Sequence, residues 1–213
     1  MGNTIISLFD YSGNWSRPYR EAGFNIIQID IKLGIDIFTW DYSNIKECYG
    51  ILAAVPCTDY ALSGAKWFAQ KDKGGRTMES NKLVIKVKEI IDYFKPSFYA
   101  IENPMSRIHK LNPWMGQPRL KFNPYDYAMY DPNPEDSAYQ KETWLWGQFN
   151  IPAKRPLENP GFLKGIVNKG GCLHNKYGGK SERTKTMRSI TPLGFAYAFY
   201  EVNCEERREQ QNV

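Results

Sequence analysis

Short apolar runs that end abruptly in turn-forming residues constrain the fold of this chain more than any other feature. Three such runs occur in the first half of the sequence, at residues 4–9, 49–55 and 98–101, and residues 25–31 are a further strand-like segment. Runs of this length without polar alternation are typical of strands that are buried on both faces, as in a parallel sheet. The sequence therefore predicts four strands before position 105.

Helices are predicted between these strands. Ser16 is expected to cap a short helix that has Pro18 in its first turn and ends at Gly23. Residues 81–94 carry apolar side chains at helical spacing, and the Lys95-Pro96 pair ends that pattern. Because strands and helices alternate, we expect an α/β fold, a doubly wound and mostly parallel sheet of the Rossmann-like type.

The pattern is weaker after Met105. Two strands and a closing helix are predicted there, at residues 125–130, 143–146 and 192–202. Residues 151–182 are rich in Gly, Pro, Lys and Asn and are expected to form an irregular basic insert, and 205–213 form a charged tail. A chain of 213 residues has room for one sizeable domain, so we expect a single domain over 1–204.

Composition narrows the class of protein. The net charge of +5 suits a polyanionic partner such as DNA. The four cysteines have no C-x-x-C spacing, and with only His109 and His174 available we expect no metal site and a reduced, cytoplasmic setting. No apolar stretch is long enough to span a bilayer and no signal-peptide pattern opens the chain, so we expect no membrane contact. We also expect a monomer.

Chemically useful side chains follow the predicted strands. In an open parallel sheet, ligands bind beyond the carboxyl ends of the strands, and the candidates there are Phe9, Asp10, Ser12, Gly13, Asp30, Ile31, Asp36, Ile37, Pro56, Cys57, Glu102 and Asn103. An acidic residue such as Asp30 suits the ribose hydroxyls of a nucleoside cofactor. A strand-end thiol such as Cys57 suits a nucleophile. Taken alone, each of these residues also has a purely structural explanation. Asp30 could be an acidic residue that ends a strand, Asp36 a helix N-cap, Gly13 a turn glycine and Cys57 a buried cysteine.

Together, these motifs resemble those of the DNA (cytosine-5)-methyltransferases. Ser7-Leu8-Phe9 with Gly13 resembles the cofactor loop, Asp30 the residue on the ribose, and Gly34-Ile35-Asp36-Ile37 the adenine-binding stretch. Pro56-Cys57 resembles the nucleophile motif and Glu102-Asn103 the pair that holds the base. Residues 188–192 resemble the last cofactor-side motif. The resemblance covers residues 4–105 well and the remainder thinly.

The resemblance implies an enzyme that transfers a methyl group from S-adenosylmethionine to carbon 5 of cytosine in DNA. Cys57 would attack carbon 6 of the base, and Glu102 would bind ring nitrogen 3. The target cytosine would be flipped out of the duplex or single-stranded. A compact enzyme of this kind would suit a bacteriophage or a restriction-modification system.

The sequence departs from the family pattern at four places. Tyr11 stands where the first glycine of the cofactor loop belongs, and Thr58 replaces the glutamine that commonly follows the cysteine. The segment 139–143, where an arginine-containing motif is expected, has Lys141 as its only cation. The usual target-recognition domain has no counterpart. DNA contacts are expected instead from cations of a mobile loop at 60–76 and of two later segments: Lys66, Arg76, Lys141 and Arg183.

Three alternatives stay open from the sequence. A thymidylate-synthase-like pyrimidine transferase also uses a Pro-Cys thiol, although a histidine usually follows that cysteine and Thr58 follows it here. A non-catalytic cofactor-binding or DNA-binding module derived from a methyltransferase would explain the missing arginines. The same chemistry on a free nucleotide or a single strand would explain the missing recognition domain.

Overall fold

The computed structural model describes residues 3–157 and 189–204. The chain divides into two compact units, where the sequence predicts a single domain. The first unit comprises residues 1–121 and 143–149, and the second comprises 122–142 and 150–213. Most of the predicted basic insert and the whole charged tail lie outside the described residues.

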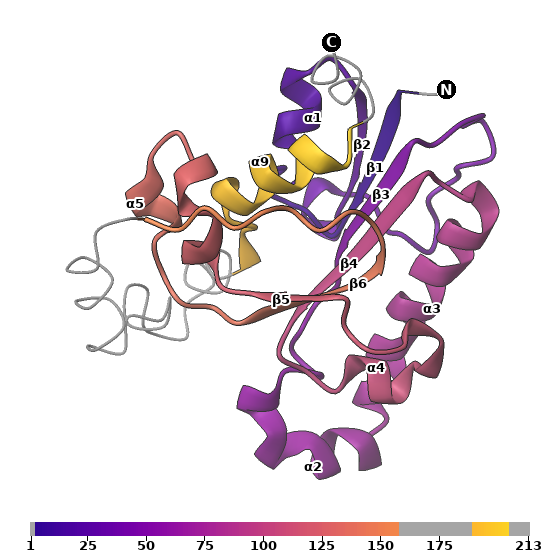
Figure 1. The fold of residues 1–213 in the computed structure, drawn as a ribbon. Helices are drawn as coiled ribbons and strands as arrows, with labels where there is room; N and C mark the ends of the chain where they lie inside the picture. The colour runs from indigo at the N-terminus through magenta and orange to yellow at the C-terminus, as the bar shows by residue number, and fades with distance from the viewer. Residues whose placement is uncertain (1–2, 158–188, 205–213) are drawn as a thin grey trace. The chain divides into compact units, whose positions relative to one another are not determined.

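A six-stranded mixed sheet with the strand order β2-β1-β3-β4-β6-β5 forms the centre of the fold (Figure 1). Its strands are β1 (Thr4–Leu8), β2 (Asn25–Ile29), β3 (Gly50–Ala54), β4 (Phe98–Pro104), β5 (Leu120–Phe122) and β6 (Thr143–Gln148). Strand β1 is parallel to β2 and β3, and β3 is parallel to β4, whereas β6 runs antiparallel to β4. The predicted α/β class with a mostly parallel sheet is confirmed, and this topology is compatible with a Rossmann-like fold.

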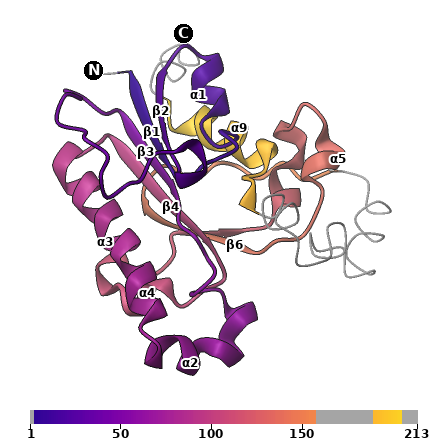
Figure 2. The same ribbon diagram turned by 180° about the vertical axis from the view of Figure 1, so that it is seen from behind.

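Helices cover both faces of the sheet in the first unit. They are α1 (Arg17–Glu21), α2 (Phe68–Lys73), α3 (Arg76–Phe94) and α4 (Ile108–Leu111). Helix α3 buries Val84, Val87 and Ile90 in a core cluster that also contains Ile6 and Ile51 from the strands. Because side chains alternate along a strand, the neighbouring residues face the other side of the sheet, where α1 lies (Figure 2).

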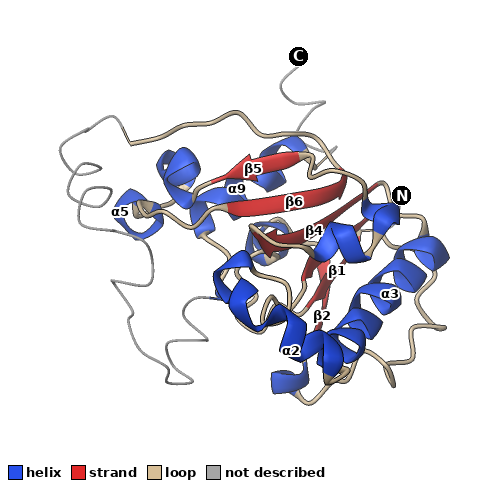
Figure 3. Ribbon diagram, turned by 90° about the horizontal axis from the view of Figure 1, so that it is seen from below, coloured by secondary structure: helices blue, strands red, loops and turns tan. Residues whose placement is uncertain are grey.

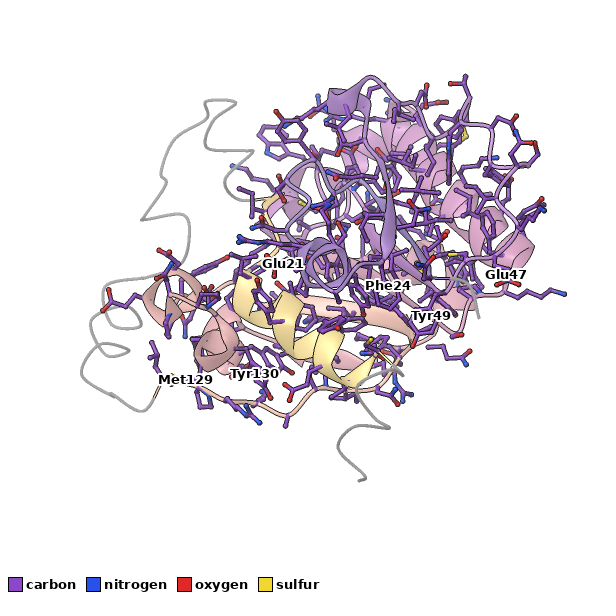
Figure 4. The ribbon with its side chains drawn as sticks, turned by 90° about the horizontal axis from the view of Figure 1, so that it is seen from above. Glu21, Phe24, Glu47, Tyr49, Met129 and Tyr130 are labelled. Atoms are coloured by element: carbon purple, nitrogen blue, oxygen red, sulfur yellow. The ribbon has the colours of Figure 1, made fainter. Side chains whose placement is uncertain are left out.

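Aromatic packing fills the α1 face. Tyr19 of α1 stacks on Phe98 with ring centroids 5.8 Å apart, and Phe24 lies 5.6 Å from Tyr49 (Figure 4). Gly50 makes room for this layer, because a Cβ atom there would lie 2.1 Å from the Phe98 ring. Tyr19 and Phe98 are both buried. Their contact packs α1 against β4, next to β3.

The second unit has its own aromatic core. Helix α9 (Leu193–Val202), α5 (Pro134–Ser137) and the 3-10 helix η4 (Pro124–Tyr130), on which Figure 4 labels Met129 and Tyr130, form it. Phe195 of α9 stacks on Phe122 with a centroid distance of 4.0 Å. The predicted closing helix at 192–202 is confirmed.

The predicted strand at residues 125–130 is wrong, because this segment forms η4. Pro124 occupies its first turn, and the main-chain N–H of Asn123 donates to the Asp126 carboxylate at 2.9 Å. Both features favour the start of a helix. Among the described residues, no helix is both long and apolar enough to cross a membrane.

Candidate active site

The four parallel strands β1 to β4 end at the same edge of the sheet, as their shared direction requires. From β1 the chain moves to β2 on one side and then to β3 on the other side. The order therefore reverses between β1 and β3, and open α/β sheets bind ligands beyond the strand ends at such a point. The loop after β1 and the turn after β3 flank it.

Cys57 and Glu102 lie at this edge on adjacent strands. Glu102 is opposite Ala54 in the β3–β4 pair, where neighbouring strands are about 4.8 Å apart. Cys57 follows Ala54 by three residues, which can span at most about 10 Å. Glu102 is buried, whereas Pro56 and Cys57 are exposed. The buried structural cysteine considered from the sequence does not describe Cys57, although it does describe Cys48, whose pKa burial raises to about 12.

Asn103 connects the two strand ends. Its side chain is fully buried, and Nδ2 donates a hydrogen bond of 2.8 Å to the main-chain oxygen of Val55, two residues before the cysteine. Its Oδ1 is buried and has no hydrogen-bond partner within the described residues. A buried acceptor in this state calls for an explanation, and a bound water or ligand is one. Asn103 is therefore suited to position the Pro56-Cys57 turn.

The chain after Cys57 is helical, whereas the sequence predicts a mobile loop at 60–76. The main-chain oxygen of Cys57 accepts hydrogen bonds from the N–H groups of Tyr60 and Ala61, at 3.0 and 2.9 Å. The 3-10 helix η2 (Leu62–Trp67) and α2 follow. The N–H of Leu62 donates to the oxygen of Met105 at 3.0 Å, which ties this segment to the chain beyond β4.

Asp59 binds several groups of that helical segment. Its carboxylate lies 3.0 Å from both Lys71 Nζ and Arg76 Nε, and Ser80 Oγ donates to it at 2.6 Å. Burial alone would raise the pKa of Asp59, but the hydrogen bonds from Ser80 and Lys71 and the charges of Lys71 and Arg76 outweigh it and hold the pKa below its usual range. Arg76, predicted to contact DNA, is thus paired with a carboxylate, whereas Lys66 is exposed and lies over the Trp67 ring.

Arg107 is a further residue of the site that the sequence motifs do not indicate. Its guanidinium binds the Asp72 carboxylate through two nitrogens at 2.7 and 2.8 Å and reaches the Asp59 main-chain oxygen at 3.3 Å. It also lies 3.7 Å from the centroid of the Phe68 ring. These bonds lower the pKa of Asp72 to about 2. Arg107 therefore connects α2 to the turn that carries Cys57.

The loop after β1 is organised by Asp10. The buried carboxylate accepts hydrogen bonds from the hydroxyls of Ser7 and Ser12, both at 3.0 Å, and from Ser16. The Ser16 hydroxyl thus contacts Asp10 and makes no helix-cap bond, which differs from the cap predicted from the sequence. Phe9 has φ +60° and Gly13 has φ +68°. A non-glycine residue in this region costs about 1–2 kcal/mol, so the surrounding loop holds Phe9 in a strained conformation.

The remaining cofactor candidates follow β2. Asp30 is half-buried, and its Oδ1 accepts from the Lys32 N–H at 2.8 Å. Asp36 Oδ1 accepts from the Phe38 N–H at 3.0 Å in the same way. Ile31 is exposed, whereas Ile37 is buried in the α3-face core, so packing alone explains Ile37.

The other predicted DNA contacts lie elsewhere in the chain. Lys141 is half-buried in the second unit, two residues before the start of β6. Arg183 and Arg188 lie outside the described residues. In the part of the chain that the structure describes, no group of three His, Cys, Asp or Glu side chains could hold a metal ion.

The strand edge therefore combines an exposed thiol, a buried carboxyl group and a buried amide on adjacent strands. No protein-family model matches the chain, and no curated protein matches it. Thiol, carboxyl and amide groups of this kind suit a nucleophile, an acid or hydrogen-bond donor, and a group that positions the nucleophile.

Proposed function

We propose that this chain methylates carbon 5 of cytosine in DNA, with S-adenosylmethionine as the methyl donor and Cys57 as the covalent nucleophile. One observation carries the proposal. The exposed Cys57 follows β3, and the buried Glu102 lies near the end of the adjacent, parallel strand β4. The Asn103–Val55 hydrogen bond joins these two strand ends. A pyrimidine ring between the two side chains would meet a nucleophile on one side and a hydrogen-bonding carboxyl group on the other.

The residues supply the first step of this chemistry. The Cys57 thiolate would form a bond from Sγ to carbon 6 of the ring. The electron pair of the carbon 5–carbon 6 double bond would then form a carbon 4–carbon 5 double bond, and the pair of the carbon 4–nitrogen 3 double bond would move to nitrogen 3. Glu102, in its protonated form, donates to ring nitrogen 3 and stabilises the charge that develops there. Carbon 5 thereby becomes nucleophilic. Carbon 5 would take the methyl group, and the donor would leave as a neutral thioether. Loss of the carbon 5 proton to a base and departure of the thiolate would then restore the double bond.

The residues at the β1 and β2 ends fit a nucleoside cofactor by the chemistry of their donor set. The half-buried Asp30 carboxylate ends the strand beside β1, where an acceptor for two ribose hydroxyls is required. Asp36 would accept from an adenine amino group, and the loop at Phe9–Gly13 would line the cofactor. When bound, S-adenosylmethionine supplies an electrophilic methyl group.

Access to the base sets a further requirement. Carbon 6 of a stacked cytosine is unreachable for a side chain, so the base must leave the duplex or be single-stranded. The exposure of Pro56, Cys57 and Thr58 supports binding of such a base at the surface of the strand edge.

Methyl transfer from tritiated S-adenosylmethionine tests this function. We expect label in duplex or single-stranded DNA that contains cytosine and none in DNA in which every cytosine is replaced by thymine. Bisulfite sequencing of host DNA after expression then locates the modified positions. Label that depends on folate would indicate a thymidylate-synthase-like transferase, and DNA binding without label in any substrate would indicate a non-catalytic module.

A further inference from the structure

The chain between Asn103 and Tyr125 contains no aspartate or glutamate. It carries a histidine and four cations, namely His109, Arg107, Lys110, Arg119 and Lys121. Arg107 is bound by Asp72, which leaves three cations, and all three are exposed. This segment starts where β4 ends, directly after the Glu102-Asn103 pair in the chain.

Aromatic rings lie among these cations. His109 of α4 stacks on Trp146 with centroids 5.6 Å apart and lies 6.0 Å from Trp144. Lys121 Nζ is 4.3 Å from the centroid of the Trp144 ring. We name the surface formed by His109, Lys110, Lys121 and Trp144 the basic–aromatic patch. All four residues belong to the first unit.

The two lysines of the patch act on the same histidine. Burial, and then the charges of Lys110 and Lys121, lower the pKa of His109, which indicates that both ammonium groups act on one small region. Within residues 3–157 and 189–204, no ion pair joins a carboxylate to Lys110 or Lys121. The Nδ1 atom of His109 is buried, and no hydrogen-bond partner for it occurs in the same ranges.

The sheet register connects the patch to the site. Trp144 of β6 is opposite Asn103 of β4, whose amide holds the Val55 oxygen. Figure 3 shows β4, β6 and β5 side by side. A polyanion that reaches Cys57 from this side would therefore meet the patch.

We propose that the basic–aromatic patch binds the phosphate backbone of the DNA strand that flanks the target cytosine. Unpaired ammonium groups bind phosphates, and half-buried aromatic rings can add stacking contacts to neighbouring bases. This inference rests on the proposed function for the choice of DNA as the polyanion.

Equilibrium binding of a fluorescein-labelled DNA duplex, measured by anisotropy without cofactor, tests the patch. Each of Lys110→Gln and Lys121→Gln should weaken binding at least about 3-fold and lower the slope of log Kd against log salt by about 1, because one phosphate contact is lost. Lys46→Gln is the matched control, since Lys46 is exposed on the loop before β3 and carries the same charge. It should change Kd less than 2-fold, or about 0.4 kcal/mol.

The outcomes separate this inference from the proposed function. The proposal that the patch binds DNA would be overturned if all three variants, Lys110→Gln, Lys121→Gln and Lys46→Gln, bound the duplex equally. This holds whatever methyl transfer the wild type shows. A reduced salt slope in the two patch variants, but not in Lys46→Gln, would support DNA binding by the patch even if no label were transferred. The absence of label would then count against the proposed methyl transfer and not against the patch. Tighter binding to anionic phospholipid vesicles than to DNA would overturn the choice of DNA.

Discussion

The side-chain amide of Asn103 donates a 2.8 Å hydrogen bond to the main-chain oxygen of Val55, the residue that follows the neighbouring strand β3. Val55 directly precedes Pro56-Cys57, and Asn103 directly follows Glu102. One buried bond therefore links the segment that carries the thiol to the segment that carries the carboxyl group. The separation of the two reactive groups depends on it.

Replacing Asn103 by alanine should reduce both stability and thiol positioning. The Val55 oxygen would lose a buried donor, which costs about 1–3 kcal/mol of unfolding free energy, measurable by urea denaturation. Asn25→Ala removes a bond of 3.3 Å between exposed side chains and should cost less than about 0.5 kcal/mol. Equal losses in the two variants would show that the Asn103 bond has no special role.

The Arg107–Asp72 pair should make stability depend on pH at the acid end. The folded-state pKa of Asp72 is lowered from 3.8 to about 2, so its contribution is complete above pH 3.8 and is lost as the pH falls toward 2. The urea midpoint of the wild type should therefore exceed that of Asp72→Asn at pH 5, and the two should converge near pH 2. A constant difference over this range would contradict the pairing.

Gly50 should be intolerant of a side chain because of the Phe98 ring above it. A Cβ atom would lie 2.1 Å from that ring, and overpacking of this kind costs about 1–3 kcal/mol. Gly64 offers a matched control, since a Cβ atom there would meet nothing within 4 Å. Thermal denaturation of Gly50→Ala and Gly64→Ala should separate the two, and a stable Gly50→Ala variant would contradict the packing of β3 against β4.

Asp30→Ala should weaken binding of S-adenosylmethionine without unfolding the chain. Loss of an acceptor for the ribose hydroxyls should raise Kd at least about 10-fold, or about 1.4 kcal/mol, in isothermal titration calorimetry. Asp41→Ala is the control, because the Asp41 carboxylate likewise accepts a main-chain hydrogen bond, from Ser43, but follows no strand. Unchanged affinity of Asp30→Ala would remove Asp30 from the cofactor site.

The first half of the fold follows from local sequence because its strands are continuous apolar runs that the turns at Asp10, Asp30 and Pro56 end cleanly. The same patterns bring the candidate residues to one strand edge, since parallel strands share a direction. The antiparallel course of β6 and the edge strand β5 depend on pairing with distant segments, which local patterns do not encode.

The helix and loop predictions are wrong where a side chain binds a group that local sequence patterns do not indicate. The segment after Cys57 is rich in glycine and lysine, which indicates a mobile loop, yet Asp59 and Arg107 bind its charges and hold it as helices. Serine is a common helix-capping residue, but the Ser16 hydroxyl donates a hydrogen bond to the Asp10 carboxylate instead. Residues 125–130 have strand-like composition, and Pro124 with Asp126 nevertheless starts a 3-10 helix there.

The covalent step is tested most directly by trapping on DNA in which 5-fluorocytosine replaces cytosine, in the presence of S-adenosylmethionine. The fluorine blocks the final elimination, so the wild type should yield a stable protein–DNA adduct, and peptide mass spectrometry should locate the linkage at Cys57. The Cys57→Ser variant should yield none, and Cys48→Ser, which alters a buried thiol, should still be trapped. An adduct that persists in Cys57→Ser, or that maps to another residue, would contradict Cys57 as the nucleophile.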